Sequence, residues 1–174
     1  PSGGLFFTVI RRPELTIEGL HLETVRMQVK LARVLGRLGY PDLALMWPND
    51  IATREPGSNR ARKVSGVLQE SFISGYRAQF VNVGVGINVG PTSPVQGSSS
   101  LSVSRKAVIQ GLLAESELEA EVLIREWNDR CPMAERPVSF ADARGGTSVR
   151  SGVFHGIDAQ GFARITEESG STGH

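Results

Sequence analysis

The chain has 174 residues, a formal net charge of +1 and a single cysteine, Cys131. This length fits one domain, or one domain with a small appendage, and is enough to bury a hydrophobic core. The near-neutral charge gives no electrostatic case for binding nucleic acid or an acidic membrane surface. One cysteine excludes an internal disulfide framework, and no apolar run approaches the roughly 20 residues that cross a bilayer. We therefore expect a cytoplasmic protein whose lone thiol is inert.

The first 53 residues predict a strand, a long helix and two further strands. Residues 5–10 are rich in aromatic and β-branched side chains, which favours a buried strand. Residues 18–38 space their apolar side chains at helical intervals, with Thr16 as a candidate N-cap and Gly39 just beyond the end. Two short apolar runs, at 42–47 and 51–53, read as strands on either side of a turn.

The middle of the chain predicts a hairpin and two helices. Its strands are expected at 64–72 and 77–89, joined by a turn at 74–76, and its helices at 104–113 and 116–130. Ser116 and Glu119 have the spacing of a capping box, and Trp127 is expected in the core. The basic stretch 54–62 is either a solvated hairpin tip or a flap that brings Arg60 or Arg62 near a phosphate or a protein partner.

After residue 132 the pattern changes to short strands. They are expected at 137–140, 148–157 and 162–165, separated by glycine-containing turns. This is the pattern of part of a small β-barrel that lacks its last strands. Unpaired strand edges would then fray near His174 or pair with another chain.

Three short stretches stand out because each joins an apolar strand to polar residues or glycines: 45–51, 63–68 and 83–89. Pro48 cannot donate a backbone hydrogen bond, so the first strand is expected to end or bulge there. In the third stretch Gly84, Gly86 and Asn88 alternate and therefore share one face of a strand. Two of these positions lack a side chain, so a ligand or another backbone can approach closely.

Taken together and in this order, the three stretches resemble the catalytic domain of the biotin protein ligases. That family carries Trp-Pro-Asn-Asp (here 47–50), then Lys-x-x-Gly (63–66), then Gly-x-Gly-x-Asn (84–88). The turn at 156–161, Gly-Ile-Asp-x-x-Gly, is similar to one in the family's SH3-like C-terminal domain.

The resemblance implies an α/β (α+β) fold, of which the pattern alone would give only α+β. Residues 1–132 would form the ligase-like core, a mixed and mostly antiparallel sheet with helices packed on it. Residues 133–174 would form a small SH3-like β-barrel that looks incomplete.

The resemblance also implies a reaction. A biotin–protein ligase uses ATP to turn biotin into biotinyl-adenylate, then transfers the biotinyl group to a lysine on the biotin carrier domain of a carboxylase. ATP, Mg²⁺ and biotin would be the ligands and the carrier domain the partner, with neither membrane nor nucleic acid involved; a homodimer stays open. One rival is a lipoate or octanoyl ligase or transferase on the same scaffold, and another is a non-catalytic ligase-like binding module.

Roles follow from the family motifs position by position. Lys63 would contact the biotin carboxyl and the phosphate and act as an electrostatic catalyst. Asp50 would lie at the metal, which prefers carboxylate and phosphate oxygens. The residues implied to bind biotin or adenylate are Trp47, Asn49, Lys63, Gly66, Leu68, Gly84, Gly86 and Asn88, the last through adenine. The simpler alternatives are that Lys63 is a surface lysine, that Asp50 is a turn residue, and that Asn88 is a buried asparagine whose hydrogen bonds are made within the protein.

The sequence departs from the family at two places. Met46 stands where most relatives have lysine, which removes one positive charge near the expected site. The family's Gly-Arg-Gly-Arg loop, which wraps biotin and the adenylate phosphate, is not in this sequence. On this ground we expect weak binding by these 174 residues alone, as a fragment or a degenerate relative.

Overall fold

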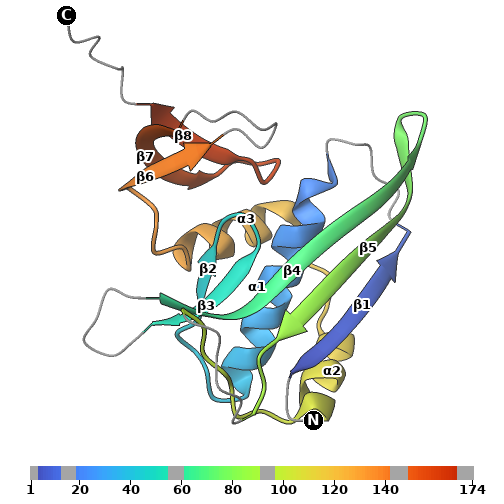
Figure 1. Cartoon of the computed structure of the whole chain (residues 1–174). Helices are drawn as coiled ribbons and strands as arrows, with labels where there is room; N and C mark the ends of the chain where they lie inside the picture. Colours follow the sequence, from blue (N-terminus) through green and yellow to red (C-terminus); the bar gives the residue numbers. More distant parts are fainter. Residues whose placement is uncertain (1–3, 13–18, 55–60, 91–96, 142–148, 168–174) are drawn as a thin grey trace, which may run out of the picture.

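The computed structural model describes residues 4–12, 19–54, 61–90, 97–141 and 149–167, which form two sheets and three helices. The larger sheet has the order β1 (Leu5–Arg11), β5 (Arg77–Ile87), β4 (Ala61–Ser74), β3 (Asp50–Arg54) and β2 (Ala44–Met46). All its neighbouring strands are antiparallel. The predicted sheet with packed helices is confirmed, although its named strands are antiparallel throughout (Figure 1).

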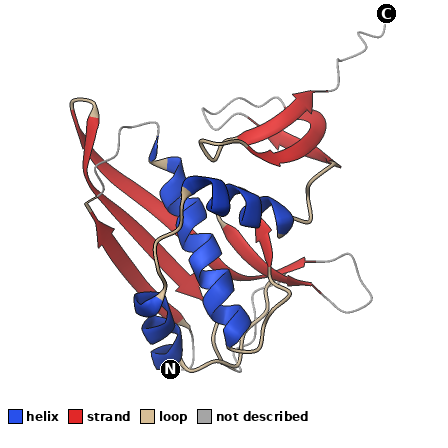
Figure 2. Ribbon diagram, turned by 180° about the vertical axis from the view of Figure 1, so that it is seen from behind, coloured by secondary structure: helices blue, strands red, loops and turns tan. Residues whose placement is uncertain are grey.

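The three helices cover one face of this sheet and leave the other face open, as Figure 2 shows. They are α1 (His21–Arg37), α2 (Arg105–Ala114) and α3 (Ala120–Asp129). The core lies between the helices and the inward-facing side chains of the central strands. Its fully buried members include Val29, Leu31, Leu35, Leu45, Ile51, Val64, Val81, Val83, Ile87, Leu123 and Trp127.

The helix α1 follows its sequence pattern closely. Its stripe of apolar residues packs on the sheet, and Gly39 adopts a φ of +103° just after the last turn, as a residue without a Cβ can. His21 is exposed, as expected, and its ring lies 4.3 Å from that of Phe162. The proposed N-cap Thr16 is outside the described residues.

The prediction of a buried strand at 5–10 is only half right. In β1 the side chains alternate, so Phe7 packs toward the helices while Phe6 is 74% and Ile10 65% exposed. The reason is that the helices cover one face of the sheet, and side chains alternate between the two faces with a period of two. The aromatic and β-branched composition predicted the strand but not the open face.

The prediction of a helix from 116 and of a capping box is wrong. The helix α3 begins at Ala120, and its N-cap Glu119 makes no side-chain cap hydrogen bond. Residues 115–119 form an extended connection instead, because Glu117 is drawn to three cations on β1 and α1. By contrast, α2 is capped: the Ser104 side chain accepts from the Ala107 N–H at 3.3 Å.

The C-terminal strands β6 (Arg136–Ala141), β7 (Val149–Ile157) and β8 (Ala163–Glu167) form an antiparallel sheet in that order. Within residues 136–141 and 149–167 this sheet is open rather than a closed barrel. It is joined to α3 through Asn128, whose amide donates to the Ile157 carbonyl at 3.2 Å and accepts from the Ile157 N–H at 2.9 Å. The glycine-containing turn expected between the strands at 137–140 and 148–157, at Gly145 and Gly146, and the end near His174 fall outside the described residues.

None of the helices in the described ranges is long and apolar enough to span a membrane. The basic stretch 54–62 is described only in part: Arg54 ends β3 and Arg62 lies in β4, whereas Arg60 is outside the described residues.

Candidate active site

The open face of the sheet carries a row of glycines at its centre. Strand register places Gly86 between Phe6 on β1 and Gly66 on β4. In the next row, Gly84 lies between Thr8 and Leu68. Gly66 also pairs with Asp50 on β3. Four of the predicted ligand-binding positions are therefore brought together on one surface, with a polar group at its β3 side.

That polar group is an ion pair. The ammonium of Lys63 lies 2.6 Å from Oδ1 of Asp50, and both side chains are partly exposed to solvent. The Lys63 side chain folds back over Gly66. A Cβ built on Gly66 would lie only 3.1 Å from Nζ of Lys63. The ammonium of Lys63 thus lies above the row of glycines. Such a group can stabilise negative charge on a ligand that rests there.

Asp50 is held by the turn that precedes it. Residues 47–49 connect β2 to β3, and the bond between Trp47 and Pro48 is cis. Asn49 ties this turn to β4, since its side-chain amide donates to the Val67 carbonyl at 2.9 Å and its own carbonyl accepts from the Val67 N–H at 2.9 Å. The side chain of Asn49 is therefore a brace for the turn in this structure. Trp47 is 40% exposed, which excludes it from the core.

Lys63 is held by the segment that follows β5. Its N–H donates to the Gly97 carbonyl at 3.2 Å, and its carbonyl accepts from the Ser99 N–H at 2.9 Å. Asn88 joins the two segments, because its amide nitrogen donates to the Ser99 carbonyl at 3.0 Å and to the Lys63 carbonyl at 3.4 Å. Asn88 thus lies beside the site and positions the backbone of Lys63.

Two residues of this region, Phe6 and Gln28, were not identified from the sequence. Phe6 lies over the glycine row: a Cβ on Gly86 would lie 3.1 Å from Cε1 of its ring. The alternation in 5–10 could have placed Phe6 and Phe7 on opposite faces, but the sequence does not say which face is open. Gln28 of α1 supports residues 46–50 from the helix side, through its amide contacts with the Met46 and Asp50 carbonyls.

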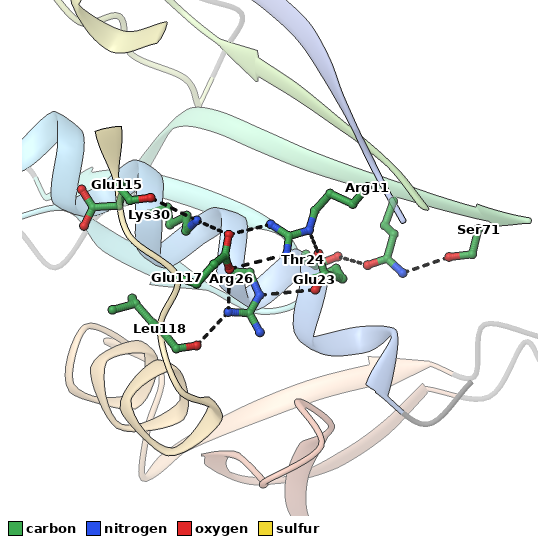
Figure 3. A network of polar contacts seen from close by, with 10 residues as sticks. Arg11, Glu23, Thr24, Arg26, Lys30, Ser71, Glu115, Glu117 and Leu118 are labelled. Atoms are coloured by element: carbon green, nitrogen blue, oxygen red, sulfur yellow. Dashed lines mark hydrogen bonds and ion pairs between the residues drawn. The ribbon is translucent and has the colours of Figure 1, made fainter. Parts of the chain in front are cut away.

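The helix-covered face of the sheet holds a cavity of about 440 Å³ that is separate from this site. Apolar side chains such as Phe7 and Met27 line it, together with the charged network of Figure 3. None of the predicted site residues lines this cavity. Cys131 is buried and its pKa is raised by that burial, as expected of an inert thiol.

The described residues contain no group of three or more His, Cys, Asp or Glu side chains placed to hold a metal ion. Asp50 is one carboxylate at the edge of the glycine row, and Mg²⁺ often uses one or two carboxylates together with substrate phosphates.

Comparison with known proteins supports the same class of protein as the geometry of the site. No protein-family model matches the chain. A curated biotin–[acetyl-CoA-carboxylase] ligase of Paracoccus denitrificans is 31% identical over 184 residues, covering 92% of this chain and 73% of that protein. The crystal structure of the biotin protein ligase of Aquifex aeolicus has a TM-score of 0.71 at 21% identity, covering 95% of this chain and 78% of that one.

A second structure of the Aquifex aeolicus ligase, in complex with biotin and ATP, has a TM-score of 0.66 at 20% identity and covers 95% of this chain and 75% of that one. The fold is therefore that of the biotin protein ligases. From the identity and coverage of the Paracoccus denitrificans relative, the chain belongs to the biotin–[acetyl-CoA-carboxylase] ligase family.

Proposed function

We propose that this chain is an ATP-dependent biotin–protein ligase acting on the biotin carrier domain of a carboxylase. The observation that carries the proposal is the Lys63–Asp50 pair, 2.6 Å apart, above a row of glycines on the open face of the sheet. Family membership supplies the substrates, since the Paracoccus relative is a ligase of this name and the Aquifex ligase was solved with biotin and ATP.

In the first step, a carboxylate oxygen of biotin attacks the α-phosphorus of ATP, and pyrophosphate leaves as biotinyl-adenylate forms. Biotin would rest on the surface formed by Gly84, Gly86 and Leu68. The ammonium of Lys63 would lie where the biotin carboxylate and the α-phosphate meet and would offset the charge that crowds there. Because Leu68 is 65% exposed, it offers an apolar wall to a ligand without rearrangement of the core.

In the second step, the amine of an acceptor lysine attacks the acyl carbon of biotinyl-adenylate, AMP leaves, and an amide bond forms. Asn88 would hydrogen-bond adenine, in addition to its contacts with the backbone of Lys63 and Ser99. Trp47, half-exposed beside the turn, and Asn49 complete the proposed adenylate side of the site.

We assign the magnesium position to the Asp50 side of the row. When bound with ATP, Mg²⁺ supplies positive charge to the phosphate oxygens. Asp50 would provide its second carboxylate oxygen to the metal while Oδ1 keeps its contact with Lys63. We further propose residues 1–132 as the catalytic core and 133–174 as an SH3-like domain, of which β6, β7 and β8 would be part.

The test is pyrophosphate release by the purified protein, measured with biotin, ATP and Mg²⁺ together and with each omitted. We expect release that requires all three, and calorimetric binding of biotin that ATP tightens. Free lipoate serves as the matched competitor, and we expect it to leave biotin-dependent release unchanged. Release driven by lipoate or octanoate in place of biotin, or biotin binding without any release, would overturn the proposal.

A further inference from the structure

One buried polar side chain lies directly beneath the turn that carries Asp50. Gln28, in the middle of α1, is fully buried among apolar residues. Its amide nitrogen donates to the Asp50 carbonyl at 3.0 Å and to the Met46 carbonyl at 3.2 Å. Met46 and Asp50 are the last register pair of β2 and β3 before the turn at 47–49. Gln28 therefore fastens both ends of this turn to the helix layer.

The orientation of the Gln28 amide is set from the other side. The indole N–H of Trp127, on α3, donates to Oε1 of Gln28 at 2.9 Å. An indole nitrogen can only donate, so the amide oxygen must face Trp127 and the amide nitrogen must face the turn. Trp127 is fully buried as well. Each polar atom of this buried pair has a partner, which is what burial requires.

We propose that Gln28 is a positioning residue for the ligase reaction and that Trp127 orients it. By fixing the backbone at Asp50, Gln28 sets the position of the Asp50 carboxylate and, through the 2.6 Å ion pair, of the Lys63 ammonium. This inference rests on the proposed function, and it assigns to the reaction two residues that do not touch the open face of the sheet.

The chemistry makes such a support important. Electrostatic stabilisation needs a charge that is already in place when the transition state forms, and small displacements of a positioned group reduce the rate steeply. The Lys63 side chain is long and half-exposed, so rotamer preference alone does not fix its ammonium. Asp50 restrains it, and the backbone of Asp50 is restrained by Gln28.

The principal variant is Gln28→Met, which keeps an unbranched side chain of similar volume and removes both halves of the amide. We expect kcat for biotin-dependent pyrophosphate release to fall at least tenfold, with KM for biotin changed less than threefold. In a Lys63→Ala background the same substitution should reduce kcat by less than it does in the wild type, because one of the two groups that Gln28 positions is then missing.

Two further variants separate positioning from stability. Leu35→Ala, also in α1 and fully buried, loses core packing without touching the turn, and it should lower the unfolding midpoint while keeping kcat. Trp127→Phe retains an aromatic ring but not the donor, so it should lower kcat in the same direction as Gln28→Met and by less. It also keeps the test open if Gln28→Met does not fold.

Hydrogen exchange supplies a readout that does not depend on activity. The Val67 N–H, which donates to the Asn49 carbonyl, should exchange faster in Gln28→Met than in Leu35→Ala. The role is overturned if the active wild type and Gln28→Met have the same kcat, if the losses in the double variant simply multiply, or if Val67 exchange is unchanged. A wild type without pyrophosphate release would instead refute the proposed function, and the exchange comparison would still decide whether Gln28 fixes the turn.

Discussion

Gly66 and Gly86 allow two large side chains to lie flat on the open face of the sheet. A Cβ on Gly66 would meet Nζ and Cε of Lys63 at 3.1 and 3.2 Å, and one on Gly86 would meet the ring of Phe6 at 3.1 Å. Both distances are shorter than most Cβ contacts in proteins, but the Lys63 ammonium is the free end of a flexible side chain and can move. At residue scale, the site depends on the missing side chains of Gly66 and Gly86 as much as on the charges of Lys63 and Asp50.

Gly66→Ala should therefore displace Lys63 rather than unfold the protein. We expect the rate of pyrophosphate release to fall roughly tenfold, since misplacing a catalytic group by about 1 Å is costly. The control is Gly36→Ala in α1, where the nearest atom to a new Cβ is 3.8 Å away. Steady-state kinetics on both variants tests this, and equal rates for Gly66→Ala and wild type would contradict it.

Lys63→Ala removes the charge itself. We expect biotinyl-adenylate formation to fall by roughly 10²–10³, the loss typical of one group that stabilises developing charge. Lys106→Ala is the matched control, because it removes an exposed lysine on α2, on the other side of the sheet. Single-turnover measurement of adenylate formation decides the matter, and a loss below about threefold for Lys63→Ala would exclude the proposed role.

At the scale of elements, Glu117 explains why α3 starts late. Its carboxylate binds Lys30 at 2.7 Å, Arg11 at 3.0 Å and Arg26 at 3.2 Å, as Figure 3 shows. These cations come from β1 and α1, so one side chain fastens the connection between α2 and α3 onto two other elements. Burial of Glu117 opposes ionisation, but the hydrogen bonds from Lys30 and Arg11 prevail and lower its pKa from 4.5 to about 2.

This lowered pKa predicts how stability depends on pH. A carboxyl group whose pKa is lower in the folded state stabilises the protein fully above its unfolded pKa, and the contribution is lost as the pH falls from about 4.5 to about 2. Glu117→Gln should reduce the free energy of unfolding at pH 7 by about 1 kcal/mol, a modest value because the side chain is 60% exposed and screened by solvent.

Urea unfolding of wild type and Glu117→Gln, at several pH values from 7 to 2.5, checks this prediction. The difference between the two proteins should shrink steadily below pH 4.5. Glu119→Gln is the control, because it neutralises an exposed acid two residues along the chain. If the difference between wild type and Glu117→Gln stays constant down to pH 2.5, the network does not stabilise the ionised carboxylate.

At the scale of the whole molecule, α3 links the two sheets. Asn128 binds both backbone groups of the buried Ile157, and its neighbour Trp127 reaches Gln28 beneath the site. Gly156 fits against the Asn128 side chain only because it has no Cβ: at its φ of +91°, a Cβ would lie 2.2 Å from Oδ1 of Asn128. The small sheet is therefore attached through hydrogen bonds of defined geometry.

Asn128→Ala should weaken this attachment. It leaves the N–H and carbonyl of Ile157 without their partner, and we expect the free energy of unfolding to fall by about 1–3 kcal/mol. Asp129→Ala, an exposed neighbour on the same helix, is the control and should change it little. Urea unfolding gives the free energies, and hydrogen exchange should show faster opening of β7 in Asn128→Ala alone.

The sequence by itself determined the elements whose signals are local. The stripe of α1 and the hairpin of β4 and β5 were predicted because periodicity and turn residues act within a few positions. The motifs at 47–50 and 63–66 were recognised from their resemblance to the ligase family. The family motifs implied that Lys63 would lie at the phosphate and Asp50 at the metal. The glycine alternation at 84 and 86 likewise predicted a shared face.

Tertiary structure decided what depends on distant parts of the chain. Which face of β1 is open, and so the place of Phe6 beside the site, depends on where the helices pack. Ser116 and Glu119 matched a local capping pattern, yet Glu117 between them binds cations more than 85 residues away in the sequence, and three such contacts outweigh one helix cap. Gln28 looked like one polar residue in an amphipathic helix, and only the packing of α1 between the turn and Trp127 gives it a role, because a buried amide takes its partners from whatever surrounds it.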